Sequence, residues 1–250
     1  MAVSATQLRD IHIPGRAEGG SPELRGVLGV PEGTGPFPAV VVMHEAFGAD
    51  EQMRLQVAKL TSLGYLTLMP DLYSMGGTRK CLIATARALR SGTGRAYADI
   101  ESARVLLLER PDANGSVGVI GFCMGGGFAL MTAADHGFDA AASNYGLLPR
   151  DLDAALEHAC PIVGSYGGAD RSLKGAAAKL ETTLSRHGIP HDLKEYPGAG
   201  HQFMNTTVNG PAVFRPFARV SGFGPNPDAA ADAWQRIDAF FREHLVPPAG

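Results

Sequence analysis

The chain has 250 residues, of which 45% are hydrophobic and 19% charged, so it can bury a full core within one α/β domain. Its formal net charge of -3 excludes a broad attraction to nucleic acid or to an anionic membrane and favours a small-molecule partner. The chain contains no apolar run of about 18 residues and no basic start followed by an apolar segment. We therefore expect a soluble, cytoplasmic protein.

The first third of the chain predicts an antiparallel pair of strands at the edge of a sheet, followed by a buried strand. Residues 7–13 and 24–30 resemble two strands joined by a segment rich in glycine and proline, as in a hairpin at a sheet edge. The run 39–43 (A-V-V-V-M) is continuously apolar, which is typical of a central parallel strand buried on both faces. Asp50 predicts the start of a helix over 51–63, and the next strand follows at 65–69.

The remainder alternates helices and strands. Helices are expected over 78–89, 95–109, 173–187 and 228–245, and strands over 117–120, 140–145, 162–166 and 191–196. No linker or repeat interrupts this alternation. The pattern predicts an α/β fold over 1–250, a single doubly wound domain whose mostly parallel sheet carries helices on both faces and binds ligands at the carboxyl ends of its strands.

Residues 117–127 read V-G-V-I-G-F-C-M-G-G-G, and they place Cys123 between a short strand and a helix expected to start near Phe128. Gly121 and Gly125 give the spacing of a nucleophile elbow with sulfur in place of oxygen, because a sharp turn needs positions without a Cβ atom. The positive end of the helix would favour a thiolate at Cys123. The alternative is a buried structural cysteine on a glycine-rich turn.

The remaining cysteines indicate no further chemistry. Three cysteines, Cys81, Cys123 and Cys160, are too few and too scattered for a disulfide framework, and no C-x-x-C pair suggests a zinc or redox site. We expect no metal and no cofactor, and we interpret Cys81 and Cys160 as packing residues.

Two further residues complete a possible catalytic set. Asp170 follows the penultimate strand, and His201 follows the last. Each alone could be an ordinary loop residue. Together with Cys123 they stand in the order expected of α/β-hydrolases, in which the acid and the base reach the nucleophile from neighbouring loops.

The chain resembles the dienelactone hydrolase family of α/β-hydrolases. The resemblance rests on residues 45–48 (E-A-F-G), 70–73 (P-D-L-Y), 121–126 (G-F-C-M-G-G), Asp170, and 196–201 (Y-P-G-A-G-H) with Phe203. Residues 74–94 and 205–227 depart from the family pattern. The resemblance implies an enzyme that cleaves an ester or lactone, and the substrate could be anionic. General carboxylesterase or thioesterase activity and a non-catalytic binding protein remain alternatives, and the protein could be a monomer or a homodimer.

The expected chemistry assigns a role to each residue type. Cys123 would attack the carbonyl and form a thioester acyl-enzyme, His201 would move the proton, and Asp170 would orient the imidazole. The backbone N–H groups of Met124 and Ala46 would form the oxyanion hole. His44 could line that loop or be a core histidine with both ring nitrogens satisfied.

The family resemblance also suggests how a substrate is bound. It implies that Glu45 hydrogen-bonds the resting thiol and deprotonates it when an anionic substrate displaces Glu45 from an arginine. A carboxylate paired with an arginine for purely structural reasons is the alternative. Family members hold a substrate carboxylate with arginine, and Arg79 is our candidate. Apolar walls are expected from four aromatic residues: Phe47, Tyr73, Tyr145 and Phe203.

Residues 205–227 predict an ordered loop without regular secondary structure that covers the site. Four prolines exclude a regular helix or a central strand, and the aromatic content argues against disorder: Pro211, Pro216, Pro225 and Pro227, with Phe214, Phe217 and Phe223. We interpret the segment as a lid. Packing against the protein's own surface or against a dimer partner is the alternative.

Overall fold

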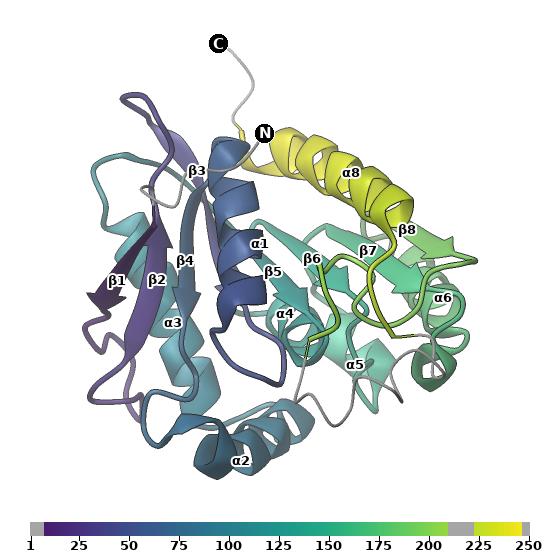
Figure 1. Ribbon diagram of the computed structural model, residues 1–250, viewed down its shortest axis with the longest axis horizontal. Helices are drawn as coiled ribbons and strands as arrows, with labels where there is room; N and C mark the ends of the chain where they lie inside the picture. The colour runs from purple at the N-terminus through teal and green to yellow at the C-terminus, as the bar shows by residue number, and fades with distance from the viewer. Residues whose placement is uncertain (1–7, 210–222, 247–250) are drawn as a thin grey trace.

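The apolar run predicted as a central strand lies in the middle of a sheet that crosses the whole molecule (Figure 1). The structure is a computed structural model that describes residues 8–209 and 223–246. Within these residues eight strands form one sheet in the order β1-β2-β4-β3-β5-β6-β7-β8. The strands are β1 (Leu8–His12), β2 (Arg25–Gly29), β3 (Phe37–Met43), β4 (Leu66–Pro70), β5 (Ala113–Phe122), β6 (Ala140–Asn144), β7 (Ile162–Gly167) and β8 (His191–Tyr196).

The strand directions confirm the predicted topology. β1 and β2 pair antiparallel at one edge, β2 is antiparallel to β4, and every pair from β4 to β8 is parallel. The register of β3 against β5 sets Met43 opposite Gly121. Residues just beyond the two strand ends, Glu45 and Cys123, therefore leave the sheet at the same level.

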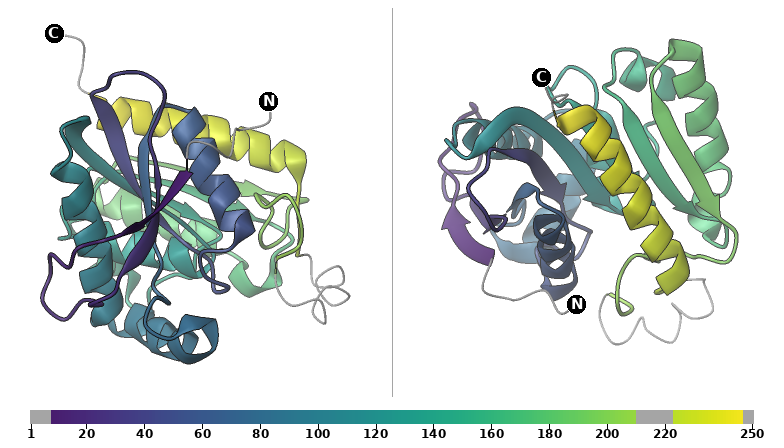
Figure 2. Two further views of the ribbon diagram at one scale, coloured as in Figure 1. Left: turned by 60° about the vertical axis from the view of Figure 1, so that its left-hand side comes forward. Right: turned by 90° about the horizontal axis from the view of Figure 1, so that it is seen from above.

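Helices cover both faces of the sheet (Figure 2), as predicted. α1 (Glu51–Ser62) and α8 (Pro227–Leu245) lie on one face, and α3 (Arg95–Leu108), α4 (Met124–Thr132) and α6 (Ala176–His187) lie on the other. α2 (Gly77–Ser91) packs on α3 and α4, and the short α5 (Leu152–Leu156) packs between α4 and α6. None of the described helices is long and apolar enough to cross a bilayer.

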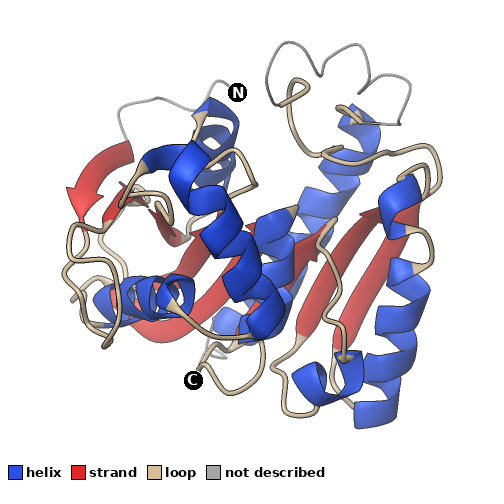
Figure 3. Ribbon diagram, turned by 90° about the horizontal axis from the view of Figure 1, so that it is seen from below, coloured by secondary structure: helices blue, strands red, loops and turns tan. Residues whose placement is uncertain are grey.

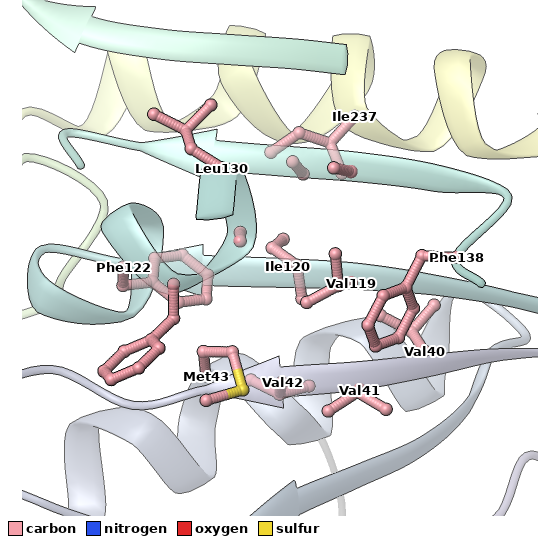
Figure 4. Close-up of a cluster of buried hydrophobic side chains, with 14 of the residues drawn as sticks. Val40, Val41, Val42, Met43, Val119, Ile120, Phe122, Leu130, Phe138 and Ile237 are labelled. Atoms are coloured by element: carbon pink, nitrogen blue, oxygen red, sulfur yellow. The ribbon is translucent and has the colours of Figure 1, made fainter. Parts of the chain in front are cut away.

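The core is centred on β3 and β5 (Figure 4). Val40, Val41 and Val42 are completely buried, since helices cover this strand from both sides. Leu130 of α4 and Ile237 of α8 reach the same cluster from opposite faces. Burial on both faces explains why β3 is apolar at every position rather than at alternate ones.

Some predicted element boundaries are wrong. α4 begins at Met124 rather than near Phe128, because glycines 125–127 form the first helical turn itself. β5 begins at Ala113, earlier than the strand predicted over 117–120. The helix predicted from residue 173 is divided into a 3-10 turn, Arg171–Leu173, and α6, because Gly175 between them adopts a φ of 74°. The short helix α5 was not predicted.

The predicted lid lies largely outside the described residues. This is so for Phe214, Phe217, Pro211 and Pro216. Phe223 is described, and it forms an isolated parallel bridge with His201. The closing of this segment over the site stays a prediction.

Arg236 joins α8 to β8 by hydrogen bonds, and its substitution tests how much these bonds stabilise the packing of the helix on the sheet. Its guanidinium donates to the backbone carbonyl of Asp192 at 2.7 Å and to the Tyr196 hydroxyl at 3.2 Å, and its side chain is only 14% exposed. Arg236→Met should lower the free energy of unfolding by roughly 2–4 kcal/mol, because the partners left behind are partly buried. Urea denaturation followed by circular dichroism measures this loss.

Arg242 on the same helix is the matched control. Its side chain is 56% exposed and pairs with Asp238 in an i,i+4 arrangement. Arg242→Met should therefore change the free energy of unfolding by about 0.5 kcal/mol or less. Equal losses in the two variants would contradict the anchoring of α8 by Arg236.

Candidate active site

The predicted catalytic residues all follow the carboxyl ends of parallel strands. Figure 3 shows these strands in red, with loops in tan at their ends. Glu45 follows β3, Cys123 follows β5, and Tyr145 follows β6. Asp170 and His201 come after β7 and β8. Since these strands are adjacent and parallel, their ends meet along one rim of the sheet.

Cys123 occupies a strained turn between β5 and α4. Its φ of 54° and ψ of -116° are unusual for a residue with a side chain. A Cβ atom on Gly121 would lie 1.9 Å from the Gly125 carbonyl oxygen, and one on Gly125 would lie 2.2 Å from the Met43 carbonyl oxygen. These contacts confirm that the turn needs glycine on both sides of the cysteine.

His201 and Asp170 are in direct contact. His201 Nδ1 lies 2.6 Å from Asp170 Oδ2, and both side chains are buried. The other carboxylate oxygen, Oδ1, accepts hydrogen bonds from the Ser172 backbone N–H at 2.9 Å and hydroxyl at 2.6 Å. Because Nδ1 faces the carboxylate, Nε2 is the ring nitrogen that remains to interact with Cys123, whose sulfur is near enough to raise the pKa of His201.

The electrostatics of the His201–Asp170 pair favour the charged forms of both groups. Burial disfavours the imidazolium of His201, but the hydrogen bond to Asp170 and the nearby Cys123 sulfur raise its pKa to about 10. Burial likewise opposes ionisation of Asp170, yet bonds from His201 and Ser172 hold its pKa below the ordinary value. At neutral pH the site therefore favours an imidazolium between a carboxylate and the sulfur.

Glu45 is completely buried and accepts hydrogen bonds from uncharged donors. Tyr145 Oη donates to Oε1 at 3.3 Å, Gln202 Nε2 to Oε2 at 3.0 Å, and Asn205 Nδ2 to both oxygens at 3.2 Å. Asn209 Nδ2 donates to Oε2 at 3.0 Å. Burial nevertheless raises the pKa of Glu45, while these amide bonds and the nearby His201 oppose the increase.

These contacts differ from the predicted partners of Glu45. Across the described ranges, its donors are a tyrosine and three amides; neither the Cys123 thiol nor an arginine is among them. Within the described residues the expected sharing of the carboxylate between the thiol and an arginine is not among these contacts, and it stays a prediction. Glu45 lies near His201 as a buried carboxylate held by a tyrosine and three amides.

The residues after His201 are hydrogen-bonded to side chains of α1. Gln56 Nε2 donates to the Met204 carbonyl at 3.0 Å, and Gln52 Oε1 accepts from the Thr206 backbone N–H at 3.0 Å. Asn209 bridges Glu45 to Asp50, which caps α1. This network keeps the amides in place around Glu45.

The predicted oxyanion-hole residues lie where two backbone segments meet. Met124 is the first residue of α4, so its N–H has no acceptor within the helix. The contact of Gly125 with the end of β3 brings this helix start against the backbone that leads to Ala46. The two N–H groups therefore come from adjoining backbone segments.

The predicted binding residues differ in exposure. Phe47 is 37% exposed and can contact a substrate directly. Tyr73, Tyr145 and Phe203 are buried in the core, and their role as apolar walls of a substrate site stays a prediction. Arg79 is exposed on the first turn of α2, and its contact with a substrate stays a prediction.

Sequence reasoning missed the groups that hold Glu45. Gln202, Asn205 and Asn209 were not predicted, and Tyr145 was predicted only as an apolar surface. The available signal was the succession of amides within eight residues after His201. A buried carboxylate requires donors of this kind.

Comparisons with known proteins agree with this architecture. The model of the "Dienelactone hydrolase family" matches residues 24–245. The carboxymethylenebutenolidase of Pseudomonas putida is 29% identical over 189 residues, which cover 70% of this chain and 78% of that protein.

Two solved structures share the fold. A dienelactone hydrolase from Anabaena variabilis gives a TM-score of 0.66 at 23% identity and covers 96% of this chain and 99% of that one. A dienelactone hydrolase-like promiscuous phosphotriesterase from metagenomic libraries gives a TM-score of 0.75 at 21% identity, with 95% and 98% covered. These matches confirm the α/β-hydrolase fold.

The contact between Asp170 and His201 predicts a measurable pKa. Asp170→Asn should lower the pKa of His201 from about 10 towards 6.5, because an amide does not stabilise the imidazolium. His201 should stabilise the wild-type fold fully below pH 6.5, and this contribution should be lost as the pH rises through about 10. NMR titration of the imidazole tests the shift, with the exposed Asp135→Asn as control. An unchanged His201 pKa in Asp170→Asn would contradict the pairing.

The buried carboxylate predicts a gain in stability on neutralisation. Glu45→Gln should stabilise the protein above pH 4.5, because burial raises the pKa of Glu45 in the folded state only. The gain should grow with pH by about 1.4 kcal/mol for each unit of the pKa shift and vanish in acid. Denaturation across pH measures it, with the exposed Glu18→Gln as control. A pH-independent difference would rule out burial of the charge as its cause.

Proposed function

Because the chain belongs to the dienelactone hydrolase family of hydrolases, we propose that it cleaves an ester or lactone through a Cys123–His201–Asp170 triad. The observation that carries this proposal is the line of contacts from Asp170 through His201 to a cysteine on a strained, glycine-flanked turn. A nucleophile on a tight strand-to-helix turn, with a base held by a buried acid, is the arrangement that nucleophilic catalysis requires. No cofactor takes part in this chemistry.

The first half of the reaction forms a thioester. The Cys123 thiolate attacks the carbonyl carbon of the substrate, a carbon–sulfur bond forms, and the carbonyl oxygen becomes an oxyanion. When the oxyanion collapses, the ester carbon–oxygen bond breaks, and His201 Nε2 gives its proton to the departing oxygen. In a lactone that oxygen stays attached to the acyl group as a new hydroxyl or enol.

The second half consumes water. Neutral His201 takes a proton from a water molecule, whose oxygen attacks the thioester carbonyl. The carbon–sulfur bond then breaks, the acid product leaves, and the thiolate and imidazolium are restored. Asp170 stabilises the imidazolium throughout, which agrees with the raised pKa of His201.

The oxyanion would accept hydrogen bonds from the backbone N–H groups of Met124 and Ala46. Support comes from the position of Met124 at the start of α4, where the N–H groups and the helix dipole favour negative charge. The loop containing Ala46 adjoins this helix start through Gly125.

We assign Glu45 an electrostatic role in the same site. Its carboxylate and the imidazolium of His201 stabilise each other's charged forms, and its amide partners fix it in position. Glu45 would thus favour the thiolate–imidazolium pair from the side opposite to the solvent. Deprotonation of the thiol would pass through His201.

The substrate class rests on the relatives. Carboxymethylenebutenolidase, the name of the Pseudomonas putida protein, makes dienelactones the first substrates to test. Phe47 would contact the substrate, and Arg79 would bind a substrate carboxylate if the substrate is anionic. A general carboxylesterase or thioesterase would use the same triad, so a substrate panel must separate these activities.

The deciding experiment compares wild type with Cys123→Ala on cis- and trans-dienelactone, a neutral aryl ester and an acyl thioester. We expect Cys123→Ala to lower kcat/KM by a factor of about 10³ or more on every substrate that wild type cleaves, because the covalent step is lost. Its circular dichroism spectrum and melting temperature should match wild type, since the thiol is only partly buried.

Each alternative has its own outcome. Activity of Cys123→Ala within tenfold of wild type would overturn the triad. Preference for the aryl ester or thioester over both lactones would favour a general esterase or thioesterase. Absence of turnover by wild type on all four would favour a binding protein.

A further inference from the structure

His44 lies between the candidate catalytic loop and the next strand end, and it is completely buried. Its Nδ1 is 2.7 Å from the Glu45 carbonyl oxygen, and its Nε2 is 3.1 Å from the Leu72 backbone nitrogen. Both ring nitrogens are therefore occupied by backbone groups. The histidine can neither bind a substrate nor transfer a proton without breaking one of these bonds.

The partners fix the tautomer of His44. A carbonyl oxygen can only accept and a backbone N–H can only donate, so Nδ1 carries the proton and Nε2 is the acceptor. The ring is thus neutral. Burial also lowers the pKa of His44, which keeps it neutral at physiological pH. A protonated ring would direct a second N–H at the N–H of Leu72.

The bond to Glu45 determines the direction of a different group. The Glu45 carbonyl and the Ala46 N–H belong to the same peptide unit. This peptide is trans, since the cis bond in the described part of the chain is Gly35–Pro36. In a planar trans peptide the C=O and N–H bonds point in opposite directions. By holding the carbonyl, His44 directs the Ala46 N–H away from its own ring.

Other contacts complete the same turn. The Gly48 N–H donates to the Glu45 carbonyl at 3.1 Å, and the Tyr73 hydroxyl donates to the Ala46 carbonyl at 3.0 Å. The rings of His44 and Tyr73 contact edge to face, with centroids 4.9 Å apart. The carbonyls of two successive peptides, those of Glu45 and Ala46, are thus both held by hydrogen bonds.

We propose that His44 is a positioning residue that sets the oxyanion hole by holding the Glu45–Ala46 peptide with its Ala46 N–H directed at the reacting carbonyl. The inference rests on the proposed hydrolytic function. A donor already aligned before the substrate arrives needs no reorganisation as the oxyanion develops, which is the main source of such stabilisation. His44 would therefore lower the barrier without touching the substrate.

The test uses two substitutions that each keep one of the two hydrogen bonds. In His44→Asn the amide nitrogen can replace Nδ1 and still donate to Glu45. In His44→Gln the side-chain oxygen can replace Nε2 and still accept from Leu72. We expect His44→Gln to lower kcat/KM roughly 10- to 100-fold, part of the loss seen on removing an oxyanion donor, and His44→Asn to stay within about threefold of wild type.

Inhibition separates this role from a general loss of structure. A trifluoromethyl ketone adds to the thiolate as a tetrahedral oxyanion, so its Ki should rise in His44→Gln by the same factor as kcat/KM falls. Alkylation of Cys123 by iodoacetamide needs no oxyanion hole and should keep its wild-type rate. Equal activity of the two variants, or parallel losses in alkylation and inhibition, would overturn the inference.

Histidine NMR provides a measurement that needs no variant to fold. In wild type labelled with ¹⁵N-histidine, His44 should show a protonated Nδ1 and an unprotonated Nε2 across neutral pH. The opposite tautomer would overturn the inference even if the enzyme is active. If turnover does not depend on Cys123, the proposed function fails instead, and the tautomer result still reports on His44 alone.

Discussion

The close approach of the first turn of α4 to the ends of β3 and β6 is the constraint on which the site depends. It is possible only where Cβ atoms are absent: at Gly126 a Cβ would lie 2.7 Å from Gly146, and at Gly125 it would meet the backbone of Met43. This contact has three effects together. It forces Cys123 into a strained conformation, exposes the N–H groups of a helix start, and brings them to the loop that follows β3.

The second organising factor is charge burial. Glu45, Asp170 and His201 are each at most 6% exposed, and a buried ionised group is stable only with hydrogen bonds and opposite charges around it. Ser172 donates hydrogen bonds to Asp170, whereas a tyrosine and three amides donate to Glu45. The amides of the loop after β8 thus stabilise the buried carboxylate of Glu45. The hydrogen bonds between this loop and α1 keep those amides in position.

Much of this architecture could be predicted because the signals are local. The apolar run of β3, the glycines around Cys123 and the positions of Asp170 and His201 at strand ends each follow from a few adjacent residues. The partners of Glu45 could not be predicted in the same way, since they lie about 100 to 164 positions away in sequence. The start of α4 was misplaced because glycine is a poor helix former, and here packing against the sheet overrides that propensity. Tyr145 and Phe203 are buried because aromatic rings at strand ends also fill the core.

The way the chain leaves and re-enters the site has an evolutionary consequence. It departs at Asn209, whose amide bonds Glu45 and Asp50, and it returns where the N–H groups of Gly224 and Asn226 bond the carbonyls of His201 and Phe203. Both attachments are made by described residues, so the backbone of His201 is held independently of the sequence that connects Asn209 to Phe223. Substitutions in that connecting sequence can therefore accumulate without displacing His201.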